Sequence, residues 1–268
     1  MSVNQLEKIF NPRIVAVVAD SHGHDLKTDA LLANLARTAP PRRVYLVGGE
    51  SFPLKTEFQS AAALADIRED IDLLFLMPPL SELPPLLSPK VLSRTAAVVI
   101  NKNITSSHDR EILDQLAAAA IKTNTRLLGV NSSGILRPSI QLNLSTHPQL
   151  PQSGKIAFFS QSGAVLSTII DLARELEIGF SHVAGIGSLL DVDFGDLIDF
   201  VGDDPEVEAI VLYLENIRNV KKFISACRSV SRSKPIIAIK SGRHPRIHEV
   251  MQRRVFSRIG DGPVYDSA

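Results

Sequence analysis

The sequence is poor in the features that would place a protein outside the cell, in a membrane or on nucleic acid. It has a single cysteine, Cys227, so it can form no internal disulfide, and we expect it to fold in a reducing compartment. Lys and Arg together number 29, as do Asp and Glu, which leaves no excess positive charge for nucleic acid or a membrane surface. No apolar run is long enough to span a bilayer, and residues 1–15 lack the apolar block of a secretion signal. We therefore expect a cytoplasmic protein that binds neither nucleic acid nor a membrane.

Short apolar runs are abundant in the sequence, and they alternate with segments of helical periodicity. Hydrophobic residues make up 44% of the 268 and charged residues 22%, the balance of a globular protein with a substantial core. In the first half we predict strands at 13–19, 44–47, 72–77 and 96–100, a last strand beginning at 126, and helices over 3–10, 26–36, 56–64, 84–92 and 109–124. Because parallel strands need crossover connections, which are usually helical, this alternation indicates a parallel, doubly wound sheet.

The second half of the sequence repeats the alternation on a smaller scale. We predict strands at 155–160, 180–185, 209–214 and 235–239, with helices over 163–176, 194–202 and 220–229. The segment between the halves, up to Gly154, is rich in Pro, Ser, Gln and Asn and has little periodicity, so we interpret it as a connector. The sequence thus predicts an α/β protein with one domain over 1–150 and a second over 151–268.

The turn Ser160-Gln161-Ser162-Gly163 lies between an expected buried strand and an expected helix. Such a turn leaves the first helical N–H groups without intrahelical partners and places the positive end of the helix dipole behind them. Phosphate and carboxylate groups bind at helix starts of this kind. We therefore predict an anion site at these four residues, the alternative being that Ser160 or Ser162 only caps the helix.

Two clusters of charged residues could bind a metal ion. The first is Asp20-Ser21-His22-Gly23-His24-Asp25, but a zinc site needs further ligands at defined places and the sequence offers no second cluster, so we favour a solvated turn. The second consists of Asp191, Asp193 and Asp196, whose oxygens suit a divalent cation. Here we favour acidic residues that complement the dipole at a helix start.

Glu215 directly follows the predicted strand 209–214, so it lies at the same edge of the sheet as the Ser160–Gly163 turn. At that edge it could orient a cationic or hydrogen-bonding group beside a bound phosphate. The alternative is a solvated loop carboxylate.

Several motifs in the second half resemble those of the NDP-forming acyl-CoA synthetases, which are similar to the α subunit of succinyl-CoA synthetase. The motifs are Gly154–Ala164, Gly179-Phe-Ser181, Gly185-Ile-Gly-Ser188 with Asp191, Asp203-Asp-Pro205, Leu212-Tyr-Leu-Glu215, and Lys234-Pro235 to Lys240-Ser-Gly-Arg243. In the first half, Arg126-Leu-Leu-Gly-Val-Asn-Ser-Ser-Gly134 resembles part of the CoA-binding domain of the same family. The first strand of that domain usually ends in Gly-Ala-Ser, whereas here it ends in Ala19-Asp20-Ser21.

The resemblance implies a CoA-binding Rossmann domain followed by a flavodoxin-like, doubly wound parallel-sheet ligase domain, and CoA or acetyl-CoA as ligand. It implies CoA contacts from Ser21, Pro78, Asn131, Ser132 and Gly134, phosphate contacts from Ser160, Gln161, Ser162 and Gly163, and a vestigial catalytic role for Glu215.

The family's phosphorylated histidine, which carries phosphate between acyl phosphate and nucleotide, is replaced in this sequence. In the register set by Lys240 and by the final segment 260–268, its position holds Arg254, while His244 and His248 lie out of register. Arginine stays protonated and cannot accept phosphate as a nucleophile. This departure resembles the synthetase-like region of bacterial protein lysine acetyltransferases, in which a GNAT acetyltransferase domain follows, and we expect the chain to be a fragment of a longer protein.

Three hypotheses follow from these observations. The first is a CoA-binding or acyl-CoA-binding module without ligase activity that regulates a GNAT domain. The second is an active acetate–CoA ligase (ADP-forming) α module, which converts acyl-CoA, ADP and phosphate to acid, CoA and ATP with His244 or His248 in the missing role. The third is a structural or dimerisation piece without a ligand. The partners expected are a CoA thioester, a GNAT domain or a nucleotide-grasp β-type domain, and a second copy of the chain.

Overall fold

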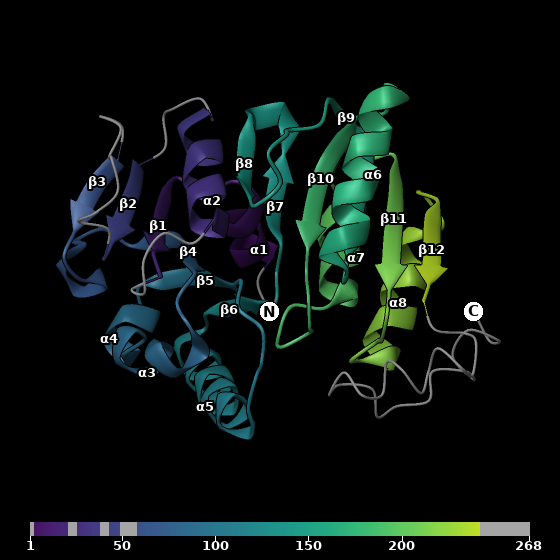
Figure 1. Ribbon diagram of the computed structural model, residues 1–268. Coiled ribbons are helices and arrows are strands. Elements are labelled where there is room, and N and C mark those ends of the chain that lie inside the picture. Colours follow the sequence, from purple (N-terminus) through teal and green to yellow (C-terminus); the bar gives the residue numbers. More distant parts are fainter. Residues whose placement is uncertain (1–2, 21–25, 38–42, 49–57, 242–268) are drawn as a thin grey trace.

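The computed structural model describes residues 3–20, 26–37, 43–48 and 58–241, which form two six-stranded sheets flanked by helices (Figure 1). The α/β fold class expected from the sequence is confirmed. Among these residues, no helix is both long and apolar enough to cross a bilayer.

The first sheet is parallel throughout and has the strand order β3-β2-β1-β4-β5-β6. Its strands are β1 (Ile14–Val18), β2 (Arg43–Val47), β3 (Phe58–Ala61), β4 (Ile71–Leu76), β5 (Thr95–Ile100) and β6 (Arg126–Leu128). The order reverses between β1 and β4. In doubly wound sheets the crevice outside the carboxyl ends of the strands at such a switch point is where ligands bind.

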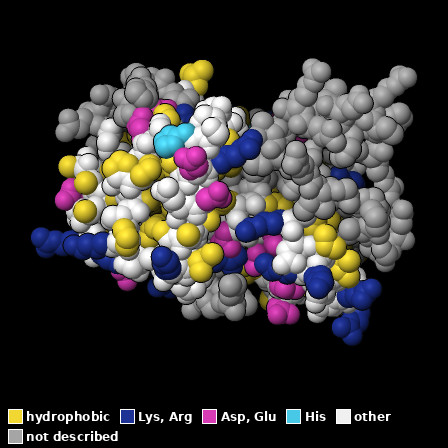
Figure 2. Space-filling view, turned by 90° about the horizontal axis from the view of Figure 1, so that it is seen from below, with side chains coloured by type: hydrophobic (Ala, Val, Ile, Leu, Met, Phe, Trp, Pro, Cys, Tyr) yellow, Lys and Arg dark blue, Asp and Glu magenta, His cyan; other side chains and the backbone are white. Residues whose placement is uncertain are grey.

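Helices cover both faces of this sheet. On one face α1 (Val3–Phe10) and α2 (Leu26–Arg37) pack on alternate strand residues such as Val17 and Phe75. On the other face α3 (Leu83–Leu86), α4 (Pro89–Leu92) and α5 (Ser107–Thr123), with the short turns η1 (Leu64–Asp66) and η2 (Leu80–Glu82), cover the intervening strand residues. Figure 2, a view from below Figure 1, shows basic and acidic side chains interspersed rather than gathered by sign.

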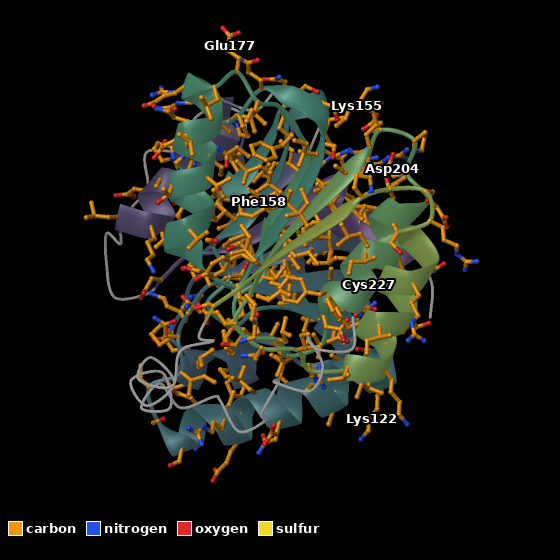
Figure 3. The ribbon with its side chains drawn as sticks, turned by 90° about the vertical axis from the view of Figure 1, so that its right-hand side faces the viewer. Lys122, Lys155, Phe158, Glu177, Asp204 and Cys227 are labelled. Atoms are coloured by element: carbon orange, nitrogen blue, oxygen red, sulfur yellow. The ribbon has the colours of Figure 1, made fainter. Side chains whose placement is uncertain are left out.

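The second sheet has the order β12-β11-β9-β10-β7-β8. Its elements are β7 (Gly134–Arg137), η3 (Pro138–Ile140), β8 (Leu142–Ser145), β9 (Ser153–Ser160), α6 (Gly163–Glu175), β10 (Phe180–Gly185), α7 (Phe194–Gly202), β11 (Ala209–Leu214), α8 (Val220–Val230) and β12 (Ile236–Lys240). Strands β9 to β12 are parallel to one another, whereas β7 is antiparallel to both β10 and β8. Figure 3 shows α6 on one side of the sheet and α7 and α8 on the other.

The two sheets share one hydrophobic core, which includes residues from α1, β1, β8, β9 and α7. Phe10 of α1 stacks on Phe200 of α7 with ring centroids 5.4 Å apart. Buried Asn34 of α2 donates two hydrogen bonds across the same seam, to the carbonyls of Ser145 (2.8 Å) and His147 (2.7 Å). The first helices of the chain therefore help to build the second half.

Three of the predicted elements are wrong. The segment interpreted as a connector contains β7 and β8, which belong to the second sheet; every residue of both strands is buried, so neither shows the alternation by which a strand is recognised. In the expected helix over 56–64, Phe58–Ala61 forms the edge strand β3, because pairing with β2 outweighs the helix propensity of its alanine-rich end. The expected helix over 84–92 is interrupted and forms two short helices, α3 and α4, since Ser88 precedes Pro89 and is therefore extended.

The division into domains at residue 150 stays a prediction. Strands β7 and β8 precede that point in the chain and yet pair within the second sheet.

Candidate functional site

The turn between β9 and α6 keeps part of its hydrogen-bonding capacity free. The Ser160 hydroxyl accepts from the Ser162 amide (3.1 Å) and donates to the Ser162 carbonyl (2.8 Å), and the Ser162 hydroxyl accepts from the Val165 amide (3.4 Å). Ser162 is the N-cap of α6, as in the alternative interpretation. The next two amides, of Gly163 and Ala164, find no acceptor among the residues that the structure describes. Capping and anion binding are therefore compatible at this turn.

Gln161 connects this turn to the end of β11. Its side-chain oxygen accepts from the amides of Glu215 (2.6 Å) and Asn216 (3.0 Å), and its side-chain nitrogen donates to Asn216 Oδ1 (3.1 Å). Its own amide donates to the Tyr213 carbonyl. Gln161 is 6% exposed, and it contributes to the predicted anion site by holding the backbone of Glu215 next to the turn.

Replacing Gln161 with Leu is expected to lower the free energy of unfolding by about 2 kcal/mol, because two backbone amides at the end of β11 lose their acceptor. Urea denaturation followed by circular dichroism measures this change. Gln115→Leu, at an exposed position of α5, is the matched control and is expected to change little. If both substitutions lower the free energy of unfolding equally, the hydrogen bonds of Gln161 to the end of β11 do not stabilise the protein as proposed.

The loop from Gly129 to Ser133 joins the carboxyl ends of both sheets. Asn131 donates its amide to the Lys102 carbonyl (3.0 Å), and Ser132 donates its amide to the Ile100 carbonyl (3.1 Å), both at the end of β5. The Ser132 hydroxyl donates to the carbonyl of Gly185 (2.5 Å), the last residue of β10. Of the residues expected to contact CoA, buried Ser132 therefore fixes this loop, while Asn131 is exposed at its tip.

Ser133, the next residue, lies where this loop contacts the anion turn, and the sequence did not single it out. A Cβ atom built on Gly163 would be 3.3 Å from Ser133 Cβ, and one built on Gly185 would be 1.7 Å from Ser133 Oγ. That hydroxyl is buried and has no hydrogen-bond partner among the described residues. Because Gly163 and Gly185 lack side chains, Ser133 can pack between the edges of the two sheets. This contact joins residues that are far apart in the sequence.

Lys102 and Asn101 place further polar groups at the end of β5. Lys102 forms an ion pair with Asp20, which follows β1, with Nζ and Oδ2 2.8 Å apart. Asn101 is 3% exposed and donates to the Ser132 carbonyl (2.6 Å), while its side-chain oxygen has no partner among the described residues. Buried Pro78 follows β4, between β1 and β5. The carboxyl edge of the first sheet, where the strand order reverses, therefore carries a cation, a carboxylate and an acceptor without a partner among the described residues.

The acidic residues near α7 are engaged within the protein. Asp193 caps α7 and forms a capping box with Asp196. Arg126 of β6 pairs with both Asp191 (2.8 Å) and Asp196 (3.1 Å), and Lys222 of α8 pairs with Asp196 as well. Burial alone would raise the pKa of Asp196, but the hydrogen bond from Lys222 and the charge of Arg126 lower it below its usual range. The interpretation as helix-start acids is confirmed for Asp193 and Asp196, whereas Asp191 instead binds the Arg126 side chain and the Leu127 amide (2.9 Å). The cluster also connects the two sheets.

Several predicted site residues lie outside the described residues, namely Ser21, His22, His24, Asp25, His244, His248 and Arg254. Within the described part of the chain, no group of three or more histidine, cysteine or acidic residues could hold a metal ion. Gly134 is described and begins β7 with φ +100°, and its amide donates to the Ser132 hydroxyl (3.1 Å). The Glu215 carboxylate is half-buried at the end of β11.

Comparison with known proteins supports the resemblance. Residues 153–268 match the succinyl-CoA ligase like flavodoxin domain. The chain is 29% identical to an ADP-forming acetate–CoA ligase of Methanocaldococcus jannaschii, over 98% of this chain and 37% of the relative. It is 28% identical to the α subunit of ADP-forming acetate–CoA ligase I of Pyrococcus furiosus, over 98% of this chain and 58% of the relative. The chain thus spans 37% of the length of the first relative and 58% of the length of the second.

A solved structure resembles the whole chain. The dinucleotide-forming acetyl-coenzyme A synthetase 1 of Candidatus Korarchaeum cryptofilum, in complex with phosphate and ADP, superposes with a TM-score of 0.87 and 27% identity. The match covers 98% of this chain and 57% of that one. The apo form of the same synthetase gives a TM-score of 0.83.

Proposed function

We propose that this chain, a homologue of the α portions of ADP-forming acetate–CoA ligases, binds a CoA thioester and phosphate as the α module of an acyl-CoA ligase. Its overall reaction would convert acyl-CoA, ADP and phosphate to acid, CoA and ATP. The observation that carries the proposal is the loop Gly129–Ser133, which connects the crevice of the first sheet to the anion turn of the second.

The first sheet would supply a CoA thioester with a binding crevice and a positive charge. The order of its strands opens a crevice between β1 and β4, and Lys102 brings a positive charge to it. CoA is a phosphate-rich nucleotide, for which a lysine is a suitable partner. Asn131, exposed at the tip of the connecting loop, would contact the part of the ligand that reaches the second sheet.

The second sheet supplies a place for phosphate. The amides of Gly163 and Ala164 lie at the start of a 13-residue helix and would donate to phosphate oxygens. The Korarchaeum synthetase described above was solved with phosphate and ADP, which supports phosphate as a ligand of this kind of protein. Glu215, held next to the turn by Gln161, would orient the reacting groups.

The arrangement suits the acyl-transfer half of the reaction. An oxygen of the bound phosphate would attack the thioester carbonyl, the carbon–sulfur bond would break, and CoA would leave as the thiolate while acyl phosphate forms. The helix amides would position phosphate for this attack, in the manner of other preorganised donors. This step needs no histidine in the chain.

A second candidate function is favoured by Arg254. With arginine at the position of the phosphorylated histidine, phosphate transfer to a nucleotide lacks its carrier. In that case the chain would bind a CoA thioester without ligating and would regulate a fused GNAT acetyltransferase domain.

Release of CoA thiol from acetyl-CoA distinguishes the two candidates. The ligase module is expected to release thiol when phosphate is added and to form labelled acetyl phosphate from radioactive phosphate, whereas sulfate in place of phosphate gives no release. The regulatory module is expected to bind acetyl-CoA in calorimetry with no phosphate-dependent release. If the protein binds neither CoA nor acetyl-CoA at millimolar concentration, both candidates are wrong.

A further inference from the structure

The ion pair between Asp20 and Lys102 lies at the carboxyl edge of the first sheet, where a doubly wound sheet forms its ligand crevice. Asp20 is the second residue after β1 and Lys102 is the second residue after β5, and β4 lies between these strands. The pair therefore spans the carboxyl end of β4 at the point where the strand order reverses. This is where a ligand of a doubly wound sheet binds.

Both charges are largely removed from water. The side chains are 12% exposed for Asp20 and 24% for Lys102, and the two charged atoms are 2.8 Å apart. A pair at this depth is less screened than one on the surface, so each charge strongly affects any further charge placed beside it. A ligand anion entering the crevice would be attracted by Lys102 and repelled by Asp20.

Lys102 is also connected to the rest of the candidate site. Its carbonyl accepts the amide of Asn131, and the preceding residue, Asn101, holds Ser132. A displacement of Lys102 toward a ligand would thus act on the loop that reaches the anion turn of the second sheet.

On the basis of the proposed function, we propose that Lys102 recognises the pyrophosphate of CoA and that Asp20 is its internal competitor, so that the ion pair must open for CoA to bind. The carboxylate keeps the lysine neutralised in the free protein and lowers the affinity of the crevice for anions. Ligand binding exchanges one partner of Lys102, the carboxylate, for another, the phosphate. ADP carries the same pyrophosphate chemistry, and pantetheine carries none.

Titration calorimetry with CoA, ADP and pantetheine tests this proposal. Asp20→Asn is expected to tighten CoA binding by about tenfold, because the competing charge is removed, and Lys102→Gln is expected to weaken it by about tenfold. Neither substitution should change the weaker binding of pantetheine by more than about twofold. If Asp20→Asn tightens the binding of ADP but not that of CoA, the assignment of this site to CoA is wrong.

An exposed ion pair provides matched controls. Lys155 and Glu208 pair at the amino end of β9, away from the crevice, with side chains 63% and 65% exposed (Figure 3). Glu208→Gln and Lys155→Gln make the same changes in net charge and should leave the CoA affinity within about twofold of the unmodified protein. Thermal unfolding of all four variants identifies any that fail to fold, and Asp20→Ser replaces Asp20→Asn in that event.

The outcomes separate this proposal from the proposed function. If the unmodified protein binds CoA and the Asp20 and Lys102 variants bind it equally well, the competitor proposal is wrong and the CoA module stands. If neither the unmodified protein nor any variant binds CoA at millimolar concentration, both are wrong. The proposal is supported if Asp20→Asn tightens CoA binding and Lys102→Gln weakens it, while the substitutions of Lys155 and Glu208 leave it unchanged.

Discussion

Replacing Gly187 with Ala is expected to lower the free energy of unfolding by about 3 kcal/mol or more and to weaken the proposed binding of CoA. Gly187 has φ +56°, and a Cβ atom there would lie 2.1 Å from the Val130 carbonyl oxygen and 2.6 Å from that of Asn131. The Val130 carbonyl accepts the Ser188 amide (2.8 Å), so the clash would also break this bond. Because both neighbours are backbone, the loop to Ser133 would have to move. Urea denaturation and calorimetry measure the two effects.

Gly48→Ala separates backbone strain from the clash. Gly48 has φ +77°, and a Cβ atom there would have no heavy atom of the described residues within 4 Å. Backbone strain alone is expected to lower the free energy of unfolding of Gly48→Ala by about 1 kcal/mol. If the two substitutions are equally destabilising, the contact between Gly187 and the loop is not what makes this glycine necessary.

Acidification from pH 6.5 to pH 4 is expected to remove about 3 kcal/mol of the stability of this protein through His182 alone. His182 lies on β10, fully buried, with its ring edge-on to Phe10 (5.1 Å) and Phe200 (5.8 Å), and neither ring nitrogen has a hydrogen-bond partner among the described residues. Burial and, to a lesser degree, the charge of Arg137 lower the pKa of His182 from 6.5 to about 4 against the attraction of Asp204.

The direction of this change in stability with pH follows from proton binding. Between pH 6.5 and 4 the unfolded chain binds a proton at residue 182 and the folded protein does not, so the free energy of unfolding falls as the pH falls through this range. His182→Leu should flatten the slope in a series of urea denaturations between pH 7 and 4. His108→Gln, at an exposed position of α5, is the control and should keep the slope of the unmodified protein. An unchanged slope in His182→Leu would show that the buried imidazole is not the group responsible.

Much of the fold could be predicted from the sequence because its strands are short apolar runs with no competing pattern. Strand Phe180–Gly185, helix Phe194–Gly202 and strand Ala209–Leu214 begin and end as predicted. The interruption of the expected helix over 84–92 at Ser88-Pro89 is local, but the other two failures share a physical cause. Strands β7 and β8 are buried on both faces, and β3 is held by its neighbour, so the signal that would identify them lies in tertiary pairing rather than in the segments themselves.

The candidate site was predictable only in part. The turn Ser160–Gly163 is recognisable because a strand, a small polar turn and a helix follow in sequence. The role of Gln161 was not predictable, since its partners at the end of β11 are more than fifty residues away. The same holds for Ser133, whose position depends on two glycines in other elements. The ion pair of Asp20 with Lys102 likewise requires the order of the strands.

The position of α1 has a consequence for how this chain can be divided. Since Phe10 stacks on Phe200 and touches His182, removing the first helix would expose the aromatic centre of the distant half to water. A fragment beginning at residue 151 would lack that helix and also two strands of its own sheet. The halves should therefore melt in a single cooperative transition. A cut near residue 150 would therefore separate β7 and β8 from the sheet to which they belong.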